Sequence, residues 1–229
     1  MNRSYHYHRL SDMIVENLNL EKNKVIGVTG TSCVGKSTFS RLLKAQMEEA
    51  GYTVFIIRAD NYLKNELRGT TSFWTYEDEY LKPEHFDWKI LWQDIERLKK
   101  GEKVQKKCYV RGIGWKKHVE FEPSDILIVE GLFLDSVEAS KEMQFDMVTA
   151  LKASDEIIRK RRMERDDYYR ANFTNYKRTR EETLREIEST LKAGKAYQSV
   201  FDMWNYLELT IVADFRAKIS RYNIKKGVL

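Results

Sequence analysis

The chain has 229 residues, of which 42% are hydrophobic and 33% charged, which fits a single α/β domain over residues 1–229 and excludes a disordered chain. The net charge of +5 is too small to indicate a nucleic-acid partner. The two cysteines, Cys33 and Cys108, are too few for a disulfide framework. No apolar run reaches membrane length and no signal core is found, so we expect a reducing cytoplasm and no membrane partner.

The first third of the chain predicts a helix, a buried strand and a second helix. Residues 10–20 have the pattern of a short amphipathic helix, within an N-terminal helical extension that we assign to residues 1–22. Residues 24–29 form an apolar run typical of a buried strand. From residue 36 to residue 50 the apolar positions recur at helical spacing, and Gly51 ends the pattern.

The rest of the chain alternates between strands and helices. A second strand is expected at residues 53–57, and residues 60–87 have no clean period, which indicates loops and a short helix. A helical stripe covers residues 88–98. Apolar strands without alternation, separated by helices, predict a doubly wound parallel sheet that is covered on both faces. The later strands are predicted at residues 126–129, 147–151 and 207–212.

One segment carries a complete phosphate-binding motif, G-x-x-x-x-G-K-[S/T], between an apolar strand and a helix. The glycines let several backbone N–H groups point at one phosphate, Lys36 reaches the β and γ phosphates, and the Ser37 hydroxyl binds Mg²⁺. The following helix offers its N-terminal end to the same anion. We therefore expect a nucleoside triphosphate to bind to the loop. The loop residues are Gly30, Thr31, Ser32, Cys33, Val34, Gly35, Lys36, Ser37 and Thr38.

Two acidic residues follow predicted strands at the edge of the sheet where this loop lies. Asp60 comes after the second strand and could take a proton from an attacking hydroxyl, or could be an ordinary turn residue. Glu130 ends the strand at 126–129, where a nucleotide-binding sheet places a carboxylate that orients Mg²⁺. The alternative for Glu130 is a plain acid at a strand end.

In order and approximate spacing these segments resemble the uridine kinase family, to which phosphoribulokinase and bacterial pantothenate kinase are more distantly related. Beyond the loop, the resemblance rests on D-N-Y at 60–62, K-K-G at 99–101, V-E-G at 129–131 and R-R-M-E-R-D at 161–166. It covers residues 22–215.

The resemblance implies a P-loop kinase with a helical lid over residues 155–180. It would transfer the γ-phosphoryl group of ATP, with Mg²⁺, to a hydroxyl of a small metabolite, with Lys36 at the phosphates. Asp60 would be the catalytic base, Tyr62 and Tyr109 would belong to the acceptor site, and Glu130 would help Ser37 to hold Mg²⁺. The lid would begin with three candidate arginines, Arg161, Arg162 and Arg165.

The lid region is strongly basic, with nine Lys or Arg and three carboxylates over residues 159–180. Its arginines could stabilise the charge on a phosphoryl group during transfer, and we favour Arg162 and Arg165 for this role, with Arg161 as a binding residue. The alternative is a solvated helix face with local ion pairs. The aromatic residues of the segment before Pro83 either stack on a ring of the acceptor or pack that segment against the rest of the domain. They are Phe73, Trp74, Tyr76 and Tyr80.

The segment after Tyr109 departs from the family pattern. It carries Val110 and Arg111 where the family has Asp, Phe and a His that reads the pyrimidine. Arg111 is either a surface residue or a contact for an acceptor with a negative charge. A nucleoside kinase similar to uridine kinase is our first prediction. The alternatives are a kinase for a sugar phosphate or hydroxy acid, and a regulatory switch that hydrolyses the triphosphate, with a homo-oligomer left open.

Overall fold

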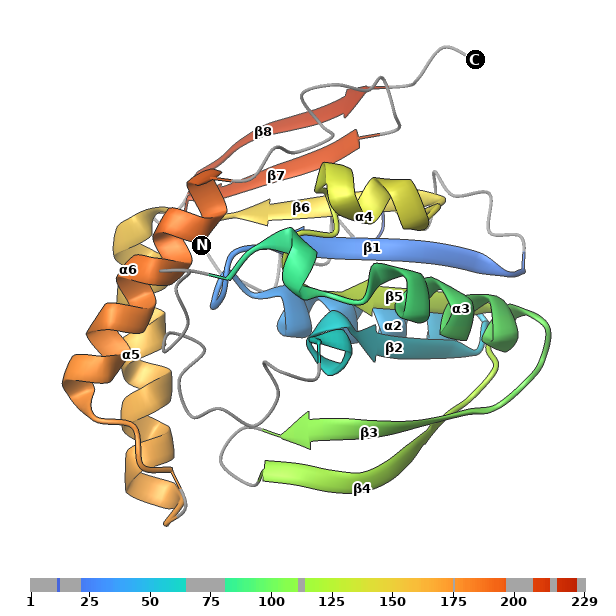
Figure 1. The fold of residues 1–229 in the computed structure, drawn as a ribbon. Coiled ribbons are helices and arrows are strands. Elements are labelled where there is room, and N and C mark those ends of the chain that lie inside the picture. Colours follow the sequence, from blue (N-terminus) through green and yellow to red (C-terminus); the bar gives the residue numbers. More distant parts are fainter. Residues whose placement is uncertain are drawn as a thin grey trace.

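The computed structural model describes residues 12, 22–64, 81–110, 114–174, 176–196, 208–214 and 218–225 (Figure 1). The strands are β1 (Lys24–Gly30), β2 (Val54–Arg58), β3 (Val104–Val110), β4 (Gly114–Phe121), β5 (Ile126–Glu130), β6 (Met147–Lys152), β7 (Glu208–Asp214) and β8 (Lys218–Lys225). The helices are α2 (Lys36–Glu49), α3 (Trp88–Lys99), α4 (Val137–Glu142), α5 (Asp155–Asn172) and α6 (Arg180–Ala196), with 3₁₀ turns η1 (Ala59–Tyr62) and η3 (Pro83–His85).

The central sheet has the strand order β2-β5-β1-β6-β7-β8. Its first five strands run parallel, and β8 pairs antiparallel with β7 at the edge. Strands β3 and β4 form a separate antiparallel hairpin. The predicted α/β class with a parallel sheet is confirmed, whereas the hairpin and the antiparallel edge strand were not predicted.

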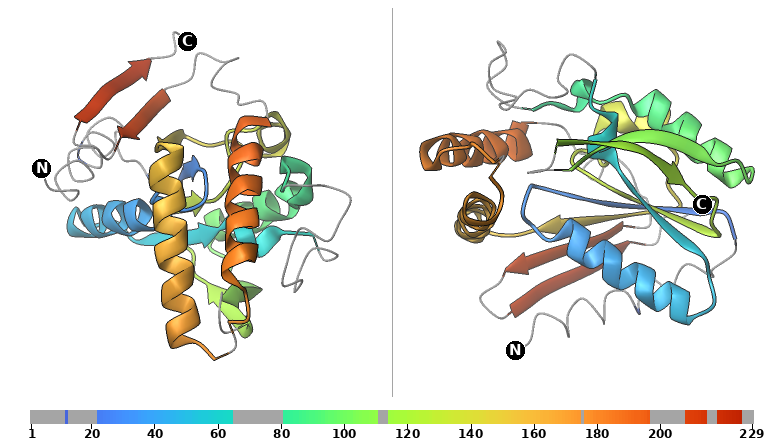
Figure 2. Two further views of the ribbon diagram at one scale, coloured as in Figure 1. Left: turned by 90° about the vertical axis from the view of Figure 1, so that its left-hand side faces the viewer. Right: turned by 90° about the horizontal axis from the view of Figure 1, so that it is seen from below.

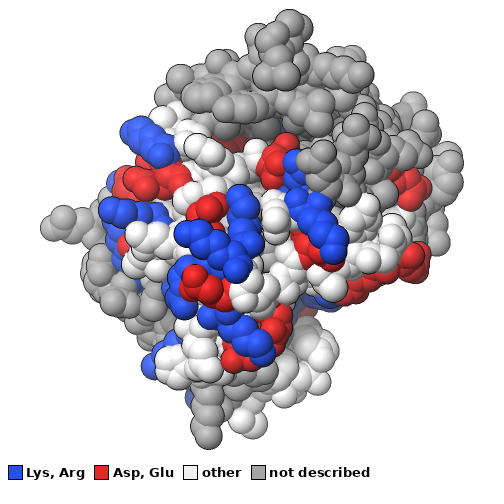
Figure 3. Space-filling view, turned by 90° about the vertical axis from the view of Figure 1, so that its right-hand side faces the viewer, with Lys and Arg blue, Asp and Glu red and all other residues white. Residues whose placement is uncertain are grey.

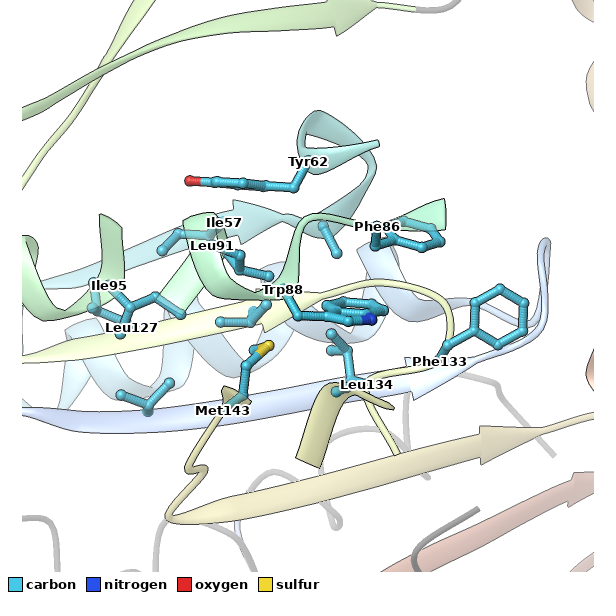
Figure 4. Close-up of a cluster of buried hydrophobic side chains, with 14 of the residues drawn as sticks. Ile57, Tyr62, Phe86, Trp88, Leu91, Ile95, Leu127, Phe133, Leu134 and Met143 are labelled. Carbon is cyan, nitrogen blue, oxygen red and sulfur yellow. The ribbon is translucent and has the colours of Figure 1, made fainter. Parts of the chain in front are cut away.

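Alternate residues of the central strands face two different hydrophobic layers. On one face, Ile26 and Val28 of β1 pack against α2 through Phe39 and Leu43. The other face of the sheet is covered by α3 and α4, and Figure 2 shows α2 and α3 on opposite sides of the sheet. In Figure 4, Trp88 and other side chains of α3 lie over β5. The sheet is therefore buried on both faces, as its unalternated apolar strands predict.

Helices α5 and α6 stand side by side across the carboxyl ends of the parallel strands (Figures 1 and 2). Figure 3 shows the opposite side of the molecule, where Lys and Arg alternate with Asp and Glu. Within the described ranges, no helix is long and apolar enough to cross a membrane.

Most predicted elements are found close to their expected positions. The strands at 24–29, 53–57, 126–129 and 147–151 correspond to β1, β2, β5 and β6, and the strand at 207–212 corresponds to β7. The predicted helices correspond to α2 and α3. The helix predicted at 10–20 lies outside the described residues apart from position 12. Outside them, too, are Phe73, Trp74, Tyr76 and Tyr80.

Candidate active site

A cleft of about 470 Å³ opens at the carboxyl edge of the sheet, between the β1–α2 loop, the ends of β2 and β5, and α5. It collects predicted site residues from four separate segments of the chain. These are Ser32, Cys33, Gly35, Lys36, Ser37, Thr38, Asp60, Glu130, Arg161 and Arg165. Two further residues, Arg58 and Glu164, also line the cleft. Glu164 belongs to the R-R-M-E-R-D segment, but the sequence predicts no role for it, and Arg58 lies in none of the motifs.

The loop after β1 owes its shape to backbone conformations that favour glycine. Gly30 has φ 133° and Gly35 has φ 120°. A Cβ atom on Gly30 would lie 2.2 Å from the carbonyl oxygen of Leu151, so a side chain there would collide with the neighbouring strand β6. Cys33 also has a positive φ, of 63°. The loop then turns directly into α2, whose N-terminal end faces the cleft as the motif predicts.

Lys36 holds its ammonium group inside this loop. Its Nζ atom donates hydrogen bonds to the carbonyl oxygens of Gly30, at 2.7 Å, and Thr31, at 2.9 Å. Burial lowers the pKa of Lys36, and the nearby carboxylates of Asp60 and Glu130 act in the opposite direction. A bound phosphate would add further negative charge and favour the protonated amine.

Glu130 and Ser37 form a pair of oxygen groups beside the loop. The Ser37 hydroxyl donates to Oε1 of Glu130 at 3.1 Å, and Nε of Arg58 lies 3.2 Å from the same oxygen. The other oxygen of Glu130, Oε2, is buried and has no hydrogen-bond partner among the described residues. A buried carboxylate oxygen normally has a partner, and Mg²⁺ prefers oxygen ligands of this kind. The two residues therefore fit a Mg²⁺ site.

Asp60 reaches the cleft because the ends of two strands approach closely. It lies in the 3₁₀ turn η1, directly after β2. A Cβ atom on Gly131 would lie 2.5 Å from Cβ of Ala59, so only a glycine after Glu130 allows this approach. The glycine of the V-E-G segment thus brings the two acids, Asp60 and Glu130, to one site.

The three arginines predicted for the lid take different positions on α5. Arg161 donates from Nη1 to the carbonyl oxygens of Val34, at 3.0 Å, and Cys33, at 3.4 Å. Arg165 and Arg161 line the cleft. Arg162 is not among the residues that line it: its side chain is 3% exposed, and its Nη1 atom donates to the Ser32 hydroxyl at 2.7 Å.

Arg162 belongs to a buried group of charges that joins α5 to α6. It pairs with Glu186 of α6 and lies 3.7 Å from Asp166. Arg178, from the segment between the helices, pairs with the same two acids. Asp166 also accepts hydrogen bonds from Nε of Arg165, at 3.2 Å, and from a threonine hydroxyl of α6. This part of the basic segment is therefore packed against α6 and is not a solvated helix face.

The residues predicted for the acceptor site are less completely placed. Tyr62 is fully buried, and its hydroxyl donates to Oδ2 of Asp94 at 2.9 Å. The amine of Lys106 lies 3.7 Å from the centre of the Tyr62 ring. Tyr62 thus lies in the core under α3 and is not among the residues that line the cleft. Tyr109 is part of β3 but its side chain is not among those described, and Arg111 lies outside the described residues.

A P-loop at the edge of a parallel sheet, with acids at the ends of the neighbouring strands, defines a P-loop kinase for small molecules. Residues 25–186 match the phosphoribulokinase / uridine kinase family, and the chain belongs to this family. The resemblance seen in the sequence motifs is confirmed.

Individual relatives agree with this assignment. The chain is 32% identical over 147 residues to a uridine kinase of Leuconostoc citreum, covering 63% of this chain and 69% of that protein. It is 27% identical over 195 residues to a uridine kinase of Borrelia turicatae, covering 82% and 85%. The chain spans between 55% and 69% of the length of three such relatives.

Solved structures of the same fold include kinases with different names. A D-glycerate 3-kinase from Cryptococcus neoformans superposes with a TM-score of 0.70 at 13% identity, covering 96% of this chain and 99% of that one. The structure of a possible uridine kinase from Bacillus stearothermophilus gives 0.52 at 20% identity, covering 79% and 98%. These likenesses establish the fold and leave the acceptor open.

Proposed function

We propose that this protein transfers the γ-phosphoryl group of ATP, with Mg²⁺, to a hydroxyl group of a small metabolite. The observation that carries the proposal is the cleft in which Lys36 and Ser37 meet Asp60 and Glu130. These residues lie at or directly after the ends of three neighbouring strands, in the spatial order β1, β5, β2. This order supports the proposal, because phosphate binding, metal binding and proton acceptance would then take place side by side.

On the donor side, the loop N–H groups and the N-terminal end of α2 bind the phosphates. The Lys36 ammonium, which now bonds two loop carbonyls, turns to the β and γ phosphates. Ser37 and Glu130 would hold Mg²⁺, which would neutralise part of the phosphate charge. Arg161 and Arg165 face the same anion from α5, while Arg162 keeps Ser32 and α5 together.

On the acceptor side, Asp60 takes the proton of the attacking hydroxyl. The hydroxyl oxygen forms a bond to the γ phosphorus, and the bond from that phosphorus to the β–γ bridging oxygen breaks. The bridging oxygen leaves with the electron pair as part of ADP, and the product is a phosphate monoester. The arginines of α5 stabilise the charge on the transferred group.

A nucleoside is the first candidate acceptor, since the relatives named above are uridine kinases. A non-nucleoside acceptor with a negative charge is the second candidate. The observation that favours it is an excess of one cation in the described cleft lining, with four cations and three carboxylates. The cations are Lys36, Arg58, Arg161 and Arg165, and the carboxylates are Asp60, Glu130 and Glu164. We place the reaction in the cytoplasm, as the free cysteines Cys33 and Cys108 suggest.

The test is ATP consumption by the dialysed protein with Mg²⁺, with and without a mixture of small hydroxyl compounds. A kinase consumes ATP much faster when the mixture is present. Equal consumption in both samples would indicate a protein that transfers the phosphoryl group to water, as a regulatory switch does.

A further inference from the structure

Arg58 is a cation in the cleft that the proposed reaction does not yet use. It is the last residue of β2, and only Ala59 separates it from Asp60 in the sequence. Its side chain is 53% exposed and lines the cleft together with Asp60. An arginine beside the proposed base is therefore accessible to whatever molecule brings its hydroxyl there.

The Nε atom of Arg58 faces Glu130, and the two Nη groups of its guanidinium are available to a ligand. Arg58 and Glu130 are partners in the register of β2 and β5, and Nε of Arg58 lies 3.2 Å from Oε1 of Glu130. The two Nη amino groups have no hydrogen-bond partner among the described residues. A planar guanidinium with both amino groups available is suited to bidentate binding of a carboxylate or phosphate.

The position of Arg58 in the sheet places it on the acceptor side. The phosphate-binding loop follows β1, Glu130 ends β5 between them, and Arg58 ends β2 at the edge of the sheet. Arg58 thus lies one strand further from β1 and its loop than Glu130, the residue with which it pairs.

The donor side has other cations besides Arg58. Lys36, Arg161 and Arg165 line the cleft and would serve the triphosphate. Glu130, with which Arg58 pairs, would also hold the divalent cation, so Arg58 would share this carboxylate when the donor is bound.

We infer that Arg58 binds a carboxylate or phosphate group of the acceptor, so that the acceptor is a small hydroxy acid or sugar phosphate. The inference rests on the proposed kinase function. Arg58 and Asp60 both line the cleft and only Ala59 separates them in the sequence, so one small molecule in the cleft could reach both side chains. Uridine, which is neutral, lacks the group that Arg58 would recognise.

The test compares matched acceptors that differ in charge: glycerate with glycerol, and ribose 5-phosphate with ribose, with uridine added. The wild-type protein should prefer the charged member of at least one pair by about tenfold or more in kcat/KM. Which pair shows the preference distinguishes a carboxylate from a phosphate. Arg58→Gln should lose about 10- to 100-fold in kcat/KM for the charged member and about twofold or less for the neutral one.

The matched control is Arg97→Gln, because Arg97 is also about half exposed and also pairs with a glutamate, Glu102, but lies in the last turn of α3 and does not line the cleft. It should change none of these values. Arg58→Lys keeps the charge without the fork and should fall between the wild type and Arg58→Gln. If Arg58 served only to hold Glu130, Arg58→Gln would raise the KM for Mg·ATP and would affect charged and neutral acceptors equally.

The outcomes separate this inference from the function on which it rests. Binding of ATP without a preference for either charged acceptor, or an unchanged charged-to-neutral ratio in Arg58→Gln, overturns the inference and leaves the kinase proposal in place. A wild-type protein that binds no ATP in a direct titration overturns both.

Discussion

The two sides of the cleft differ in what forms them: the proposed donor side is formed mainly by backbone groups, and the proposed acceptor side by side chains. The donor side is a backbone structure: its shape depends on glycines such as Gly30, and Lys36 is held by two loop carbonyls. The proposed acceptor side consists of side chains at the end of β2, Arg58 and Asp60, which both line the cleft. A backbone loop binds one kind of ligand, a phosphate chain, whereas side chains can be replaced one at a time so that a different acceptor binds. This contrast explains why one fold is found in kinases that carry different names.

The largest effect is expected on the donor side, from Lys36→Ala. It removes the cation nearest to the transferred group, and phosphoryl transfer should fall by about a thousandfold or more. The fold should persist, because burial of the Lys36 ammonium is unfavourable, as its lowered pKa indicates, and alanine removes that buried charge. Initial rates and a thermal unfolding scan would measure both. Lys89→Ala, at an exposed lysine of α3, is the control. Turnover above about a tenth of the wild-type value would contradict the whole assignment.

Asp60→Asn distinguishes an effect on proton transfer, on the proposed acceptor side, from an effect on ATP binding, on the donor side. It keeps the shape of the side chain and removes the base, so kcat should fall by about 10² to 10⁴-fold while the affinity for ATP stays nearly unchanged. Steady-state kinetics and an ATP titration would show the difference. Weakened ATP binding with an intact kcat would mean that Asp60 belongs to the metal or the fold, and not to proton transfer.

Two arginines of α5 should respond in opposite ways. Arg162→Ala leaves the buried acids Asp166 and Glu186 without one of their partners and should lower the free energy of unfolding by about 3–5 kcal/mol. Arg165→Ala should lower kcat by about 10- to 100-fold, because its side chain lines the cleft. Its loss of stability should be smaller than that of Arg162→Ala, because Asp166 keeps its other partners, Thr183 and Arg178. Arg159→Ala, which breaks an exposed pair, is the stability control. Equal stability of the Arg162 and Arg159 variants would exclude the buried network.

The smallest effect is expected at Asp125, which directly precedes β5 and so lies at the amino ends of the parallel strands, opposite the cleft. Hydrogen bonds from the backbone and hydroxyl of Thr53 lower the pKa of Asp125 from 3.8 to about 2. A lowered carboxyl pKa adds stability above pH 4, and this stability is lost as the pH falls from about 4 to about 2. Asp125→Asn should therefore destabilise the protein by on the order of 1 kcal/mol at pH 7 and by little near pH 2. A stability difference between Asp125→Asn and the wild type that does not depend on pH would show that the charge of Asp125 is not responsible. The activity of the variant should equal that of the wild type.

The donor side could be predicted from the sequence because few residues can form it. The loop needs glycine at fixed places, a lysine and a hydroxyl, and the strand and helix around it have clear periods. The positions of Asp60 and Glu130 follow from the rule that parallel strands end at one edge. Their convergence in a single cleft agrees with that rule.

The acceptor side and the lid could be predicted only in part. The hairpin of β3 and β4 was missed because Lys106 and Lys107 interrupt the alternation of β3. The burial of Arg162 depends on Glu186, which lies on another helix, and no local pattern indicates that contact. Arg58 looks like an ordinary surface charge in the sequence, and only its pairing with Glu130 across two strands places it in the site.

The destination of the γ-phosphoryl group tests the account most directly. The protein would be incubated with Mg²⁺, ATP labelled in the γ-phosphoryl group and a mixture of small hydroxyl compounds, and the products separated. The account predicts that the label appears in an organic phosphate monoester, with one ADP formed for each label transferred, and that Asp60→Asn suppresses this product. Label that appears only as inorganic phosphate, at the same rate with and without the mixture, would contradict it.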